Sequence, residues 1–117
     1  MKKITLLFIV VFASITGFSQ IYVGDVNINK KQSVDYVELV GVTKNFNIDV
    51  YVDYGQVKPK VEEIRDKNGT IARSNNIISA LNLMSKNGWV LVNNYGYGSK
   101  DENVIRYLLK KDKGSKK

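Results

Sequence analysis

The first nineteen residues most constrain what this chain of 117 residues folds into, because they are expected to be removed before the chain folds. Lys2 and Lys3 precede a run at residues 4–13 that contains nine apolar residues and one threonine. Small residues such as Gly17 and Ser19 follow before Gln20. This order is typical of a secretory signal peptide. The run is far shorter than the ~20 residues of a spanning helix, although a retained anchor is the alternative. We expect a signal peptide over residues 1–19, cleavage before Gln20 and no transmembrane anchor after processing.

The mature chain of 98 residues is long enough for one small domain with one modest core. It contains no cysteine, so it has no disulfide framework, no thiol nucleophile and no lipid-bearing cysteine behind the signal peptide. Packing alone must therefore stabilise the fold. We interpret the chain as a bacterial protein that is exported and is either periplasmic or secreted.

The basic charge of the chain is concentrated at its ends. The formal charge is +7, and it falls to +5 when Lys2 and Lys3 leave with the signal peptide. Residues 110–117 hold five lysines and one aspartate, which leaves about +1 for residues 20–109. A nucleic-acid binder usually spreads basic residues over one face of the fold, so we expect no nucleic-acid partner. We interpret residues 111–117 as a disordered basic tail, with weak contact to an anionic surface as the alternative.

Alternating residues in the first half of the mature chain predict strands. Residues 21–33 indicate a short strand or an arm. Residues 34–42 and 46–54 are rich in β-branched and aromatic residues and flank turn-forming residues at 41–45, which predicts an antiparallel hairpin. In the second strand one set of alternate residues is apolar and should be buried: Phe46, Ile48, Val50 and Val52. The other set should face water: Asn47, Asp49, Tyr51 and Asp53.

A second hairpin and a helix are predicted next. Residues 61–65 and 70–73 flank the segment 66–69, in which Asn-Gly favours a tight turn. A helix should follow to about Lys86, with its N-cap at Ser74, Asn75 or Asn76 and with Gly88 beyond its end. Its apolar residues have the spacing that buries one helix face: Ile77, Ala80, Leu81 and Met84.

Two final strands are predicted at residues 89–95 and 103–110, joined by a loop at 96–102, and Trp89 is expected in the core. The order β-β-(β-β)-α-β-β predicts an α+β fold in which a mainly antiparallel sheet of four to six strands packs against one helix. We expect one domain over residues 34–110, preceded by an arm or short strand at residues 20–33.

One family resemblance is carried by the C-terminal half. The strings ALNLMSKNGWVLVNNY and VIRYLLKK place a helix that ends in Gly-Trp, then a strand, then a last strand that closes in Tyr-x-Leu-Leu-Lys. This pattern resembles small secreted uncharacterised proteins of Bacteroidota type, and residues 36–41 and 52–56 are similar to their first hairpin. The resemblance covers about residues 34–111 and implies a compact α+β fold. It implies no activity, because these proteins are domains of unknown function.

Few residues of this chain suit catalysis. Without histidine and cysteine, Ser-His and Cys-His nucleophile systems are excluded, and zinc would have to rely on carboxylates. Asp49 and Asp53 share a predicted strand face about 13 Å apart, beyond the ~5 to 9.5 Å of glycosidase carboxylate pairs. We expect no catalytic residue, no cofactor and no metal site, with a carboxylate-dependent hydrolase, or an inhibitor of one, as the least favoured alternative.

The remaining candidate is aromatic. The chain contains seven tyrosines, and flat amphipathic rings bind sugar faces and peptide side chains at low entropic cost. Tyrosine also simply favours strands, which is the structural alternative. The candidate binding face consists of Tyr36, Tyr51 and Tyr107 on the wet face of adjacent strands and Tyr95 and Tyr97 at a loop mouth. We expect a non-catalytic envelope binding module that contacts a peptide, a glycan or a protein, and the alternative is a structural homo-oligomer.

Overall fold

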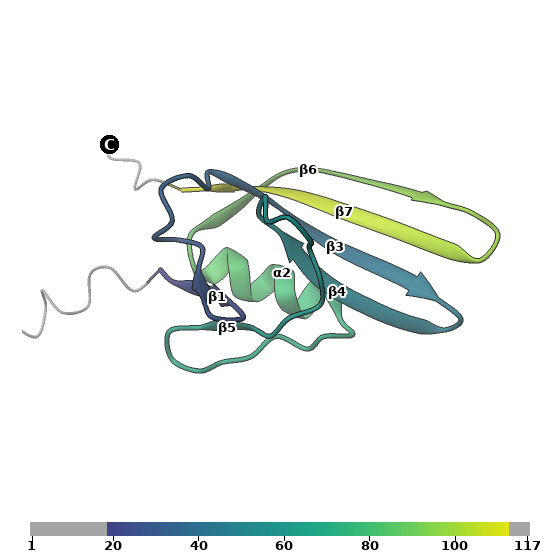
Figure 1. The fold of residues 1–117 in the computed structure, drawn as a ribbon, viewed down its shortest axis with the longest axis horizontal. Coiled ribbons are helices and arrows are strands. Elements are labelled where there is room, and N and C mark those ends of the chain that lie inside the picture. The colour runs from purple at the N-terminus through teal and green to yellow at the C-terminus, as the bar shows by residue number, and fades with distance from the viewer. Residues whose placement is uncertain (1–18, 113–117) are drawn as a thin grey trace, which may run out of the picture.

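The computed structural model describes residues 19–112, which form two antiparallel sheets and one helix (Figure 1). The three-stranded sheet has the order β2-β1-β5 and consists of β1 (Ile21–Val23), β2 (Val26–Asn27) and β5 (Ile64–Asp66). The four-stranded sheet has the order β4-β3-β7-β6 and consists of β3 (Tyr36–Lys44), β4 (Asn47–Asp53), β6 (Trp89–Gly98) and β7 (Glu102–Lys111). The helix is α2 (Ile77–Lys86). The predicted mainly antiparallel α+β fold is confirmed, but the strands divide between two sheets.

The N-terminal segment forms part of the smaller sheet and of the core. Strand β1 pairs antiparallel with β5, so that Tyr22 lies opposite Arg65. Ile21, Val23 and Ile28 are all buried. Residues 20–33 therefore form short strands that close the core, and the looser arm that the sequence also allowed is not formed.

Trp89 lies in the core, as predicted, with only 2% of its surface exposed. Its indole N–H donates to Asn29 Oδ1 at 3.0 Å, and the same oxygen accepts the backbone N–H of Ile21 at 2.8 Å. Asn29 also donates through Nδ2 to the carbonyl of Asn87 at the end of α2. Because a buried polar group needs a hydrogen-bond partner, this cluster ties the N-terminal segment to the helix end and to the start of β6.

Helix α2 has the predicted boundaries. Asn76 is the N-cap, and its side-chain oxygen accepts the backbone N–H groups of Ile78 and Ser79 at 3.1 Å. Gly88, just beyond the helix, has a φ of 88°, which a glycine adopts without steric cost. The four residues of the predicted stripe all pack against or within the core: Ile77, Ala80, Leu81 and Met84.

Gly41 lies inside β3 rather than in the predicted turn. A Cβ atom placed on Gly41 would lie 2.9 Å from Ile77 Cδ1, so the absence of a side chain lets the first turn of α2 approach the sheet closely. The turn of the β3–β4 hairpin consists of Asn45 and Phe46, which have φ values of 52° and 68°. Both residues are thus in the left-handed conformation that a two-residue hairpin turn requires.

The predicted buried face of β4 is correct only for its second half. Val50 and Val52 are fully buried, whereas Ile48 is 41% exposed and Phe46 is fully exposed in the turn. Figure 1 shows the reason, because the β3–β4 and β6–β7 hairpins both extend beyond α2. No element of the described chain covers the inner side of the hairpin tips there.

The predicted second hairpin is short. It consists of β5 and an isolated bridge between Arg65 and Ile71. The turn between them is stabilised by Asp66, whose Oδ1 accepts the N–H groups of Asn68 and Thr70 at 2.9 Å. The segment therefore turns where its Asn-Gly pair predicted, with a φ of 88° at Gly69, and the Asp66 side chain adds hydrogen bonds that the sequence pattern did not predict.

Two other boundaries differ from the prediction. Most of the expected loop at residues 96–102 continues the strands, and the turn narrows to the residues around Lys100, with the Ser99 N–H donating to the Glu102 carbonyl at 2.7 Å. Lys111 belongs to β7, and the Asp112 N–H donates to the Gly88 carbonyl, so the expected tail begins later than residue 111.

Residues 113–117 and the expected signal peptide through residue 18 lie outside the described residues. Within residues 19–112 no helix is long and apolar enough to cross a membrane.

Candidate functional site

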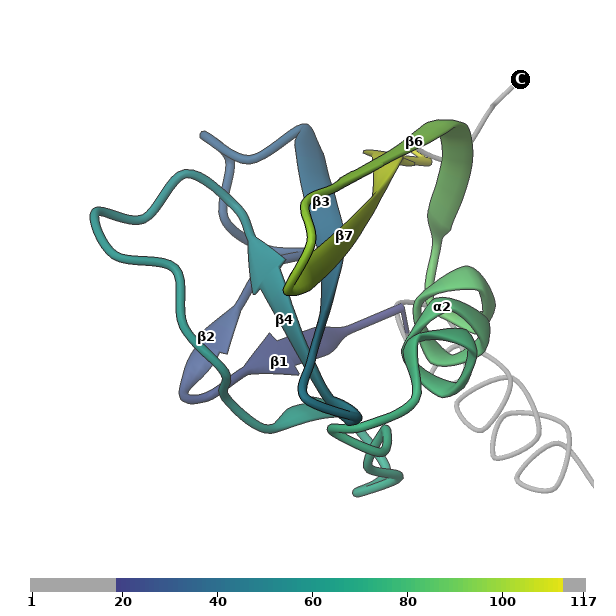
Figure 2. The same cartoon turned by 90° about the vertical axis from the view of Figure 1, so that its right-hand side faces the viewer.

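The four-stranded sheet has two unlike faces. The inner face packs against α2 and the smaller sheet, and Figure 2 shows α2 and β1 on the same side of the four-stranded sheet. We call the opposite side the outer face. Cross-strand partners point to the same side of an antiparallel sheet, so the strand register shows which residues belong to the outer face. In β3 and β4 they include Tyr36, Glu38, Val40, Val42, Asp49, Tyr51 and Asp53. In β6 and β7 they include Tyr95, Tyr97, Val104, Arg106 and Leu108.

The outer face is organised in cross-strand rows. The central row runs through Tyr51, Val40, Arg106 and Tyr95, one residue from each strand. Strands lie about 4.8 Å apart, so the Cα atoms of Tyr51 and Tyr95 are separated by about 14 Å across the sheet. Val40 is fully buried although it lies on this face, and its cross-strand partners are Tyr51 and Arg106. The next row places Tyr97 beside Val104.

An ion pair at the centre of the face holds two tyrosines in place. Arg106 Nη1 lies 2.9 Å from Glu38 Oε1, and Arg106 Nε donates to the Tyr97 hydroxyl at 3.1 Å. The Tyr95 hydroxyl donates to the second oxygen of Glu38, Oε2, at 3.1 Å. The charged partners strengthen these hydrogen bonds. One carboxylate and one guanidinium thus orient both phenol groups of β6.

The same contacts set the electrostatics of the site. Partial desolvation and the hydrogen bond to Glu38 raise the pKa of Tyr95 above its usual value. The hydrogen bond to Tyr97 is the largest cause of a raised pKa at Arg106, and the bond to Glu38 adds to it. Arg106 is therefore permanently charged, and Tyr95 stays neutral at physiological pH.

The rings of Tyr95 and Tyr97 form a small aromatic platform. Their centroids are 6.2 Å apart and their planes are inclined by 22°. The Arg106 guanidinium carbon lies 5.9 Å from the Tyr97 centroid, within the range of a cation–π contact. About half of each residue remains exposed, 48% for Tyr95 and 53% for Tyr97. The platform is therefore both oriented and accessible.

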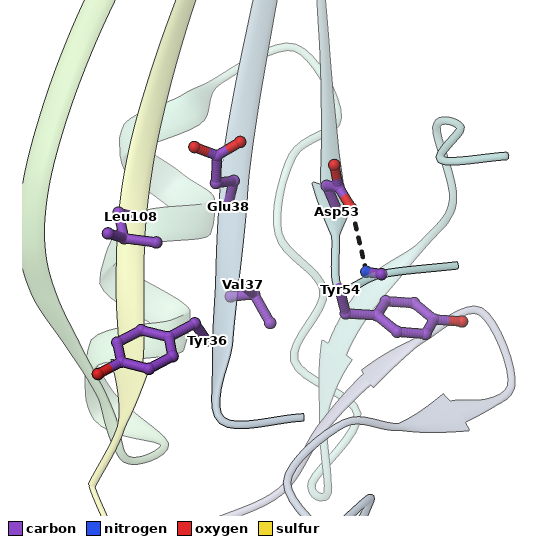
Figure 3. A pocket seen from close by; sticks show the side chains of 7 residues that line it. Tyr36, Val37, Glu38, Asp53, Tyr54 and Leu108 are labelled. Atoms are coloured by element: carbon purple, nitrogen blue, oxygen red, sulfur yellow. Dashed lines mark hydrogen bonds between the residues drawn. The ribbon is translucent and has the colours of Figure 1, made fainter. Parts of the chain in front are cut away.

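A shallow hollow of about 220 Å³ lies beside this network (Figure 3). Its lining includes Tyr36, Glu38, Asp53, Tyr54 and Leu108. The dashed line in Figure 3 marks the Gly55 N–H donating to Asp53 Oδ1 at 3.0 Å, which fixes one wall. Because Glu38 lines the hollow and also bonds Arg106 and Tyr95, the hollow adjoins the aromatic platform.

The structure brings four of the five candidate tyrosines to one face. Tyr36, Tyr51, Tyr95 and Tyr97 all lie on the outer face, and we call these four the tyrosine face. Tyr95 and Tyr97 lie within β6 rather than at a loop mouth.

The placement of Tyr107 on the wet face is wrong. Tyr107 pairs with Leu39 and packs against the core on the inner face. It has the same orientation as the buried Leu109, two residues along β7, because alternate residues of a strand point to the same side. No sequence pattern indicates Glu38 and Arg106 as site residues, because they are 68 residues apart in the chain and meet only when β3 pairs with β7.

Acidic residues outside the contact of Glu38 with Arg106 are placed as follows. Asp49 and Asp53 both lie on the outer face of β4, and Asp53 faces Glu38 across the β3–β4 ladder. Glu63 forms an ion pair with Arg65 at 3.3 Å. Within residues 19–112 no three acidic side chains gather as a group able to hold a metal ion.

No family model, no curated protein and no solved structure matches this chain. The geometry of the outer face is therefore the basis for the proposed function.

Proposed function

We propose that this protein is a non-catalytic, exported binding module of the bacterial cell envelope, whose tyrosine face contacts a peptide, a glycan or another protein. The observation that carries the proposal is the contact of Glu38 and Arg106 with Tyr95 and Tyr97. Holding exposed rings in one position before binding lowers the conformational entropy lost on binding. Such a network favours recognition over a purely structural use of tyrosine.

The chemistry of the face indicates which ligands suit it. Its central cation, Arg106, is already paired with Glu38, which leaves little positive charge for phosphates. The exposed rings of Tyr95 and Tyr97 offer apolar surfaces to sugar rings or to peptide side chains. The lining of the hollow beside Tyr36 includes Glu38 and Asp53, whose carboxylates can accept hydrogen bonds. A neutral, amphipathic ligand with both apolar faces and hydroxyl or amide groups fits this combination.

A binding assay with matched variants tests the proposal. Solubilised envelope glycan and peptide fractions are titrated onto the exported protein, and Tyr95→Ala and Tyr97→Ala are expected to weaken binding by on the order of tenfold each. Tyr107→Phe is the matched control, because it changes a tyrosine of the inner face. If all tyrosine-face alanine variants bind every identified ligand as the parent does, the proposal is wrong.

Export is a separate part of the proposal with its own test. Gln20 immediately precedes β1, and its backbone N–H donates to Asn87 Oδ1 at 3.4 Å. An N-terminal ammonium at Gln20 would retain this contact. Expression of the full chain in a bacterial host should therefore yield a periplasmic or secreted product whose mass begins at Gln20. A product that keeps residues 1–19 would contradict the proposed processing.

A further inference from the structure

The two edges of the four-stranded sheet differ in how they are protected. On the β4 edge, the Val50 N–H donates to the Ser74 carbonyl at 3.0 Å, and Gln56 Nε2 donates to the Val52 carbonyl at 2.9 Å. Strand β4 also carries Asp49 and Asp53, and charged side chains discourage edge pairing. Strand β6 has ten residues without a charge or a proline, and all but the first are exposed. Within residues 19–112 no strand pairs with its outer edge.

The register identifies which backbone groups of β6 face this open edge. Ser99 donates to Glu102 at the hairpin end, so these two residues form a hydrogen-bonded pair. Hydrogen-bonded and non-hydrogen-bonded pairs alternate along an antiparallel ladder. The N–H and C=O groups of Asn94, Gly96 and Gly98 therefore point away from β7.

On the opposite edge of the sheet, the backbone groups of β4 follow the same alternation. Counting from the closing pair of Lys44 and Asn47, it directs the backbone groups of Val50 and Val52 outward. These are the two residues whose groups bond to Ser74 and Gln56 outside the ladder.

Side chains leave the β6 edge accessible. The Tyr95 hydroxyl reaches Glu38 on β3, two strands away, so its ring lies over the sheet rather than over the edge. Tyr97 likewise leans toward Arg106 on β7. Gly96 and Gly98 have no side chain at all, and glycines inside strands often mark the close approach of another backbone.

We propose that β6 pairs antiparallel with β6 of a second copy of this chain, which joins the two four-stranded sheets into one continuous sheet. A second copy fits because β6 is uncharged, so two identical strands meet without like-charge repulsion. The β6–β7 register shifts between Leu91 and Asn93, and beyond this irregularity the outward groups of residues 94–98 are centred on Gly96. One register pairs all of these groups. It sets Gly96 opposite the partner subunit's Gly96 and Asn94 opposite the partner subunit's Gly98.

This register also fixes the position of the tyrosines. On the outer face it sets Tyr95 opposite the partner subunit's Tyr97 in a non-hydrogen-bonded pair, where side chains are closest. The outer faces of the two copies then form one surface. The pairing goes beyond the proposed binding function, because a monomer has a complete tyrosine face of its own.

Sedimentation of the exported protein over a range of concentrations tests the dimer. The parent protein is expected to dimerise, and Gly96→Pro should raise the dimer dissociation constant by on the order of tenfold or more, because proline removes an outward N–H. Asp49→Lys on β4 is the control and should leave the dimer unchanged. A parent protein that stays monomeric at its highest soluble concentration overturns the proposal, and so does a folded Gly96→Pro variant that dimerises like the parent.

Cross-linking tests the register without depending on the proline variant. The chain has no cysteine, so introduced thiols report one contact each. An oxidised mixture of Tyr95→Cys and Tyr97→Cys proteins should form a mixed disulfide more efficiently than either variant forms a disulfide with itself. Equal efficiencies would contradict this register.

Ligand binding by a strictly monomeric protein would overturn the dimer and leave the proposed function intact.

Discussion

Glu38 and Arg106 form an ion pair across β3 and β7 in which Oε1 and Nη1 are 2.9 Å apart and each side chain is about three-quarters buried. The carboxylate also accepts the Tyr95 hydroxyl, and the guanidinium also donates to the Tyr97 hydroxyl. The negative charge of Glu38 and the positive charge of Arg106 compensate each other on a partly apolar face. It also orients the two exposed rings, so it is the structural centre of the proposed site.

The substitution Glu38→Gln should loosen this centre. It leaves Arg106 without its anionic partner, and we expect the free energy of unfolding to fall by about 1 kcal/mol, since both side chains are partly solvated. Ligand affinity at the tyrosine face should fall as well, because Tyr95 loses its carboxylate partner and Tyr97 is bonded to an arginine that Glu38 no longer holds in place. Urea denaturation and the binding assay measure these two effects.

The control for that variant is Asp25→Asn, an exposed aspartate between β1 and β2. It removes the same charge from the smaller sheet, away from the tyrosine face. If both variants lose affinity equally, net charge rather than the Glu38 contact is responsible.

The tyrosine titration gives a pH prediction. Tyr95 has a raised pKa, so its neutral form is favoured in the folded protein. The stability that this contributes is fully present below the usual tyrosine pKa of 10.0 and is lost as the pH rises through the folded-state pKa. An absorbance titration that is compared with Tyr95→Phe should therefore show Tyr95 ionising above pH 10. Ionisation of Tyr95 below pH 10 would mean that the contact with Glu38 is not formed in solution.

Trp89→Ala should be strongly destabilising. The side chain is almost completely buried, so truncation leaves a cavity, and it also removes one of the two hydrogen bonds that the side-chain oxygen of Asn29 accepts. We expect a loss of ~3 to 5 kcal/mol in the free energy of unfolding, measured by circular dichroism in urea. Val57→Ala, at a residue that is 95% exposed, is the control and should have little effect. A loss below about 1 kcal/mol for Trp89→Ala would place the indole outside the core.

Two truncations locate the end of the folded domain. Deletion of residues 113–117 should leave the melting temperature nearly unchanged. Deletion of residues 111–117 also removes the backbone bonds from Lys111 to Asp35 and from Asp112 to Gly88, at 2.8 and 2.7 Å. We expect that larger deletion to lower the melting temperature by about 5 °C for each kcal/mol lost. A large drop with the shorter deletion would mean that residues 113–117 contribute to stability.

Local signals predicted the helix and the core tryptophan. The N-cap at Asn76, the apolar spacing of α2 and the glycine at residue 88 act within a few residues of each other, so the sequence alone identifies them. The division into two sheets depends instead on the pairing of β1 with β5, about 40 residues apart in the chain. No local pattern encodes such a pairing, and a β1 of three residues is too short to show clear alternation.

The candidate site was predictable in type but not in composition. An abundance of tyrosine is visible in the sequence, whereas the side that each ring occupies depends on the phase of the strand. The outward placement that the sequence predicts for Tyr107 is wrong for that reason. The glycines at 96 and 98 suggested a loop, although they continue β6 as a strand. The contact of Glu38 with Arg106 requires the β3–β7 pairing, which no short segment specifies.

The most direct test of the central claim is a ¹⁵N NMR titration of residues 20–117 with solubilised envelope glycan and peptide fractions at low and high salt. We expect the shifts to cluster at Tyr36, Tyr51, Tyr95 and Tyr97 and to persist at high salt, because the tyrosine face binds through rings and hydrogen bonds. Tyr107 on the inner face should shift little. Shifts confined to the lysines at the C-terminal end and abolished by salt, or no shifts with any fraction, would contradict the proposed binding face.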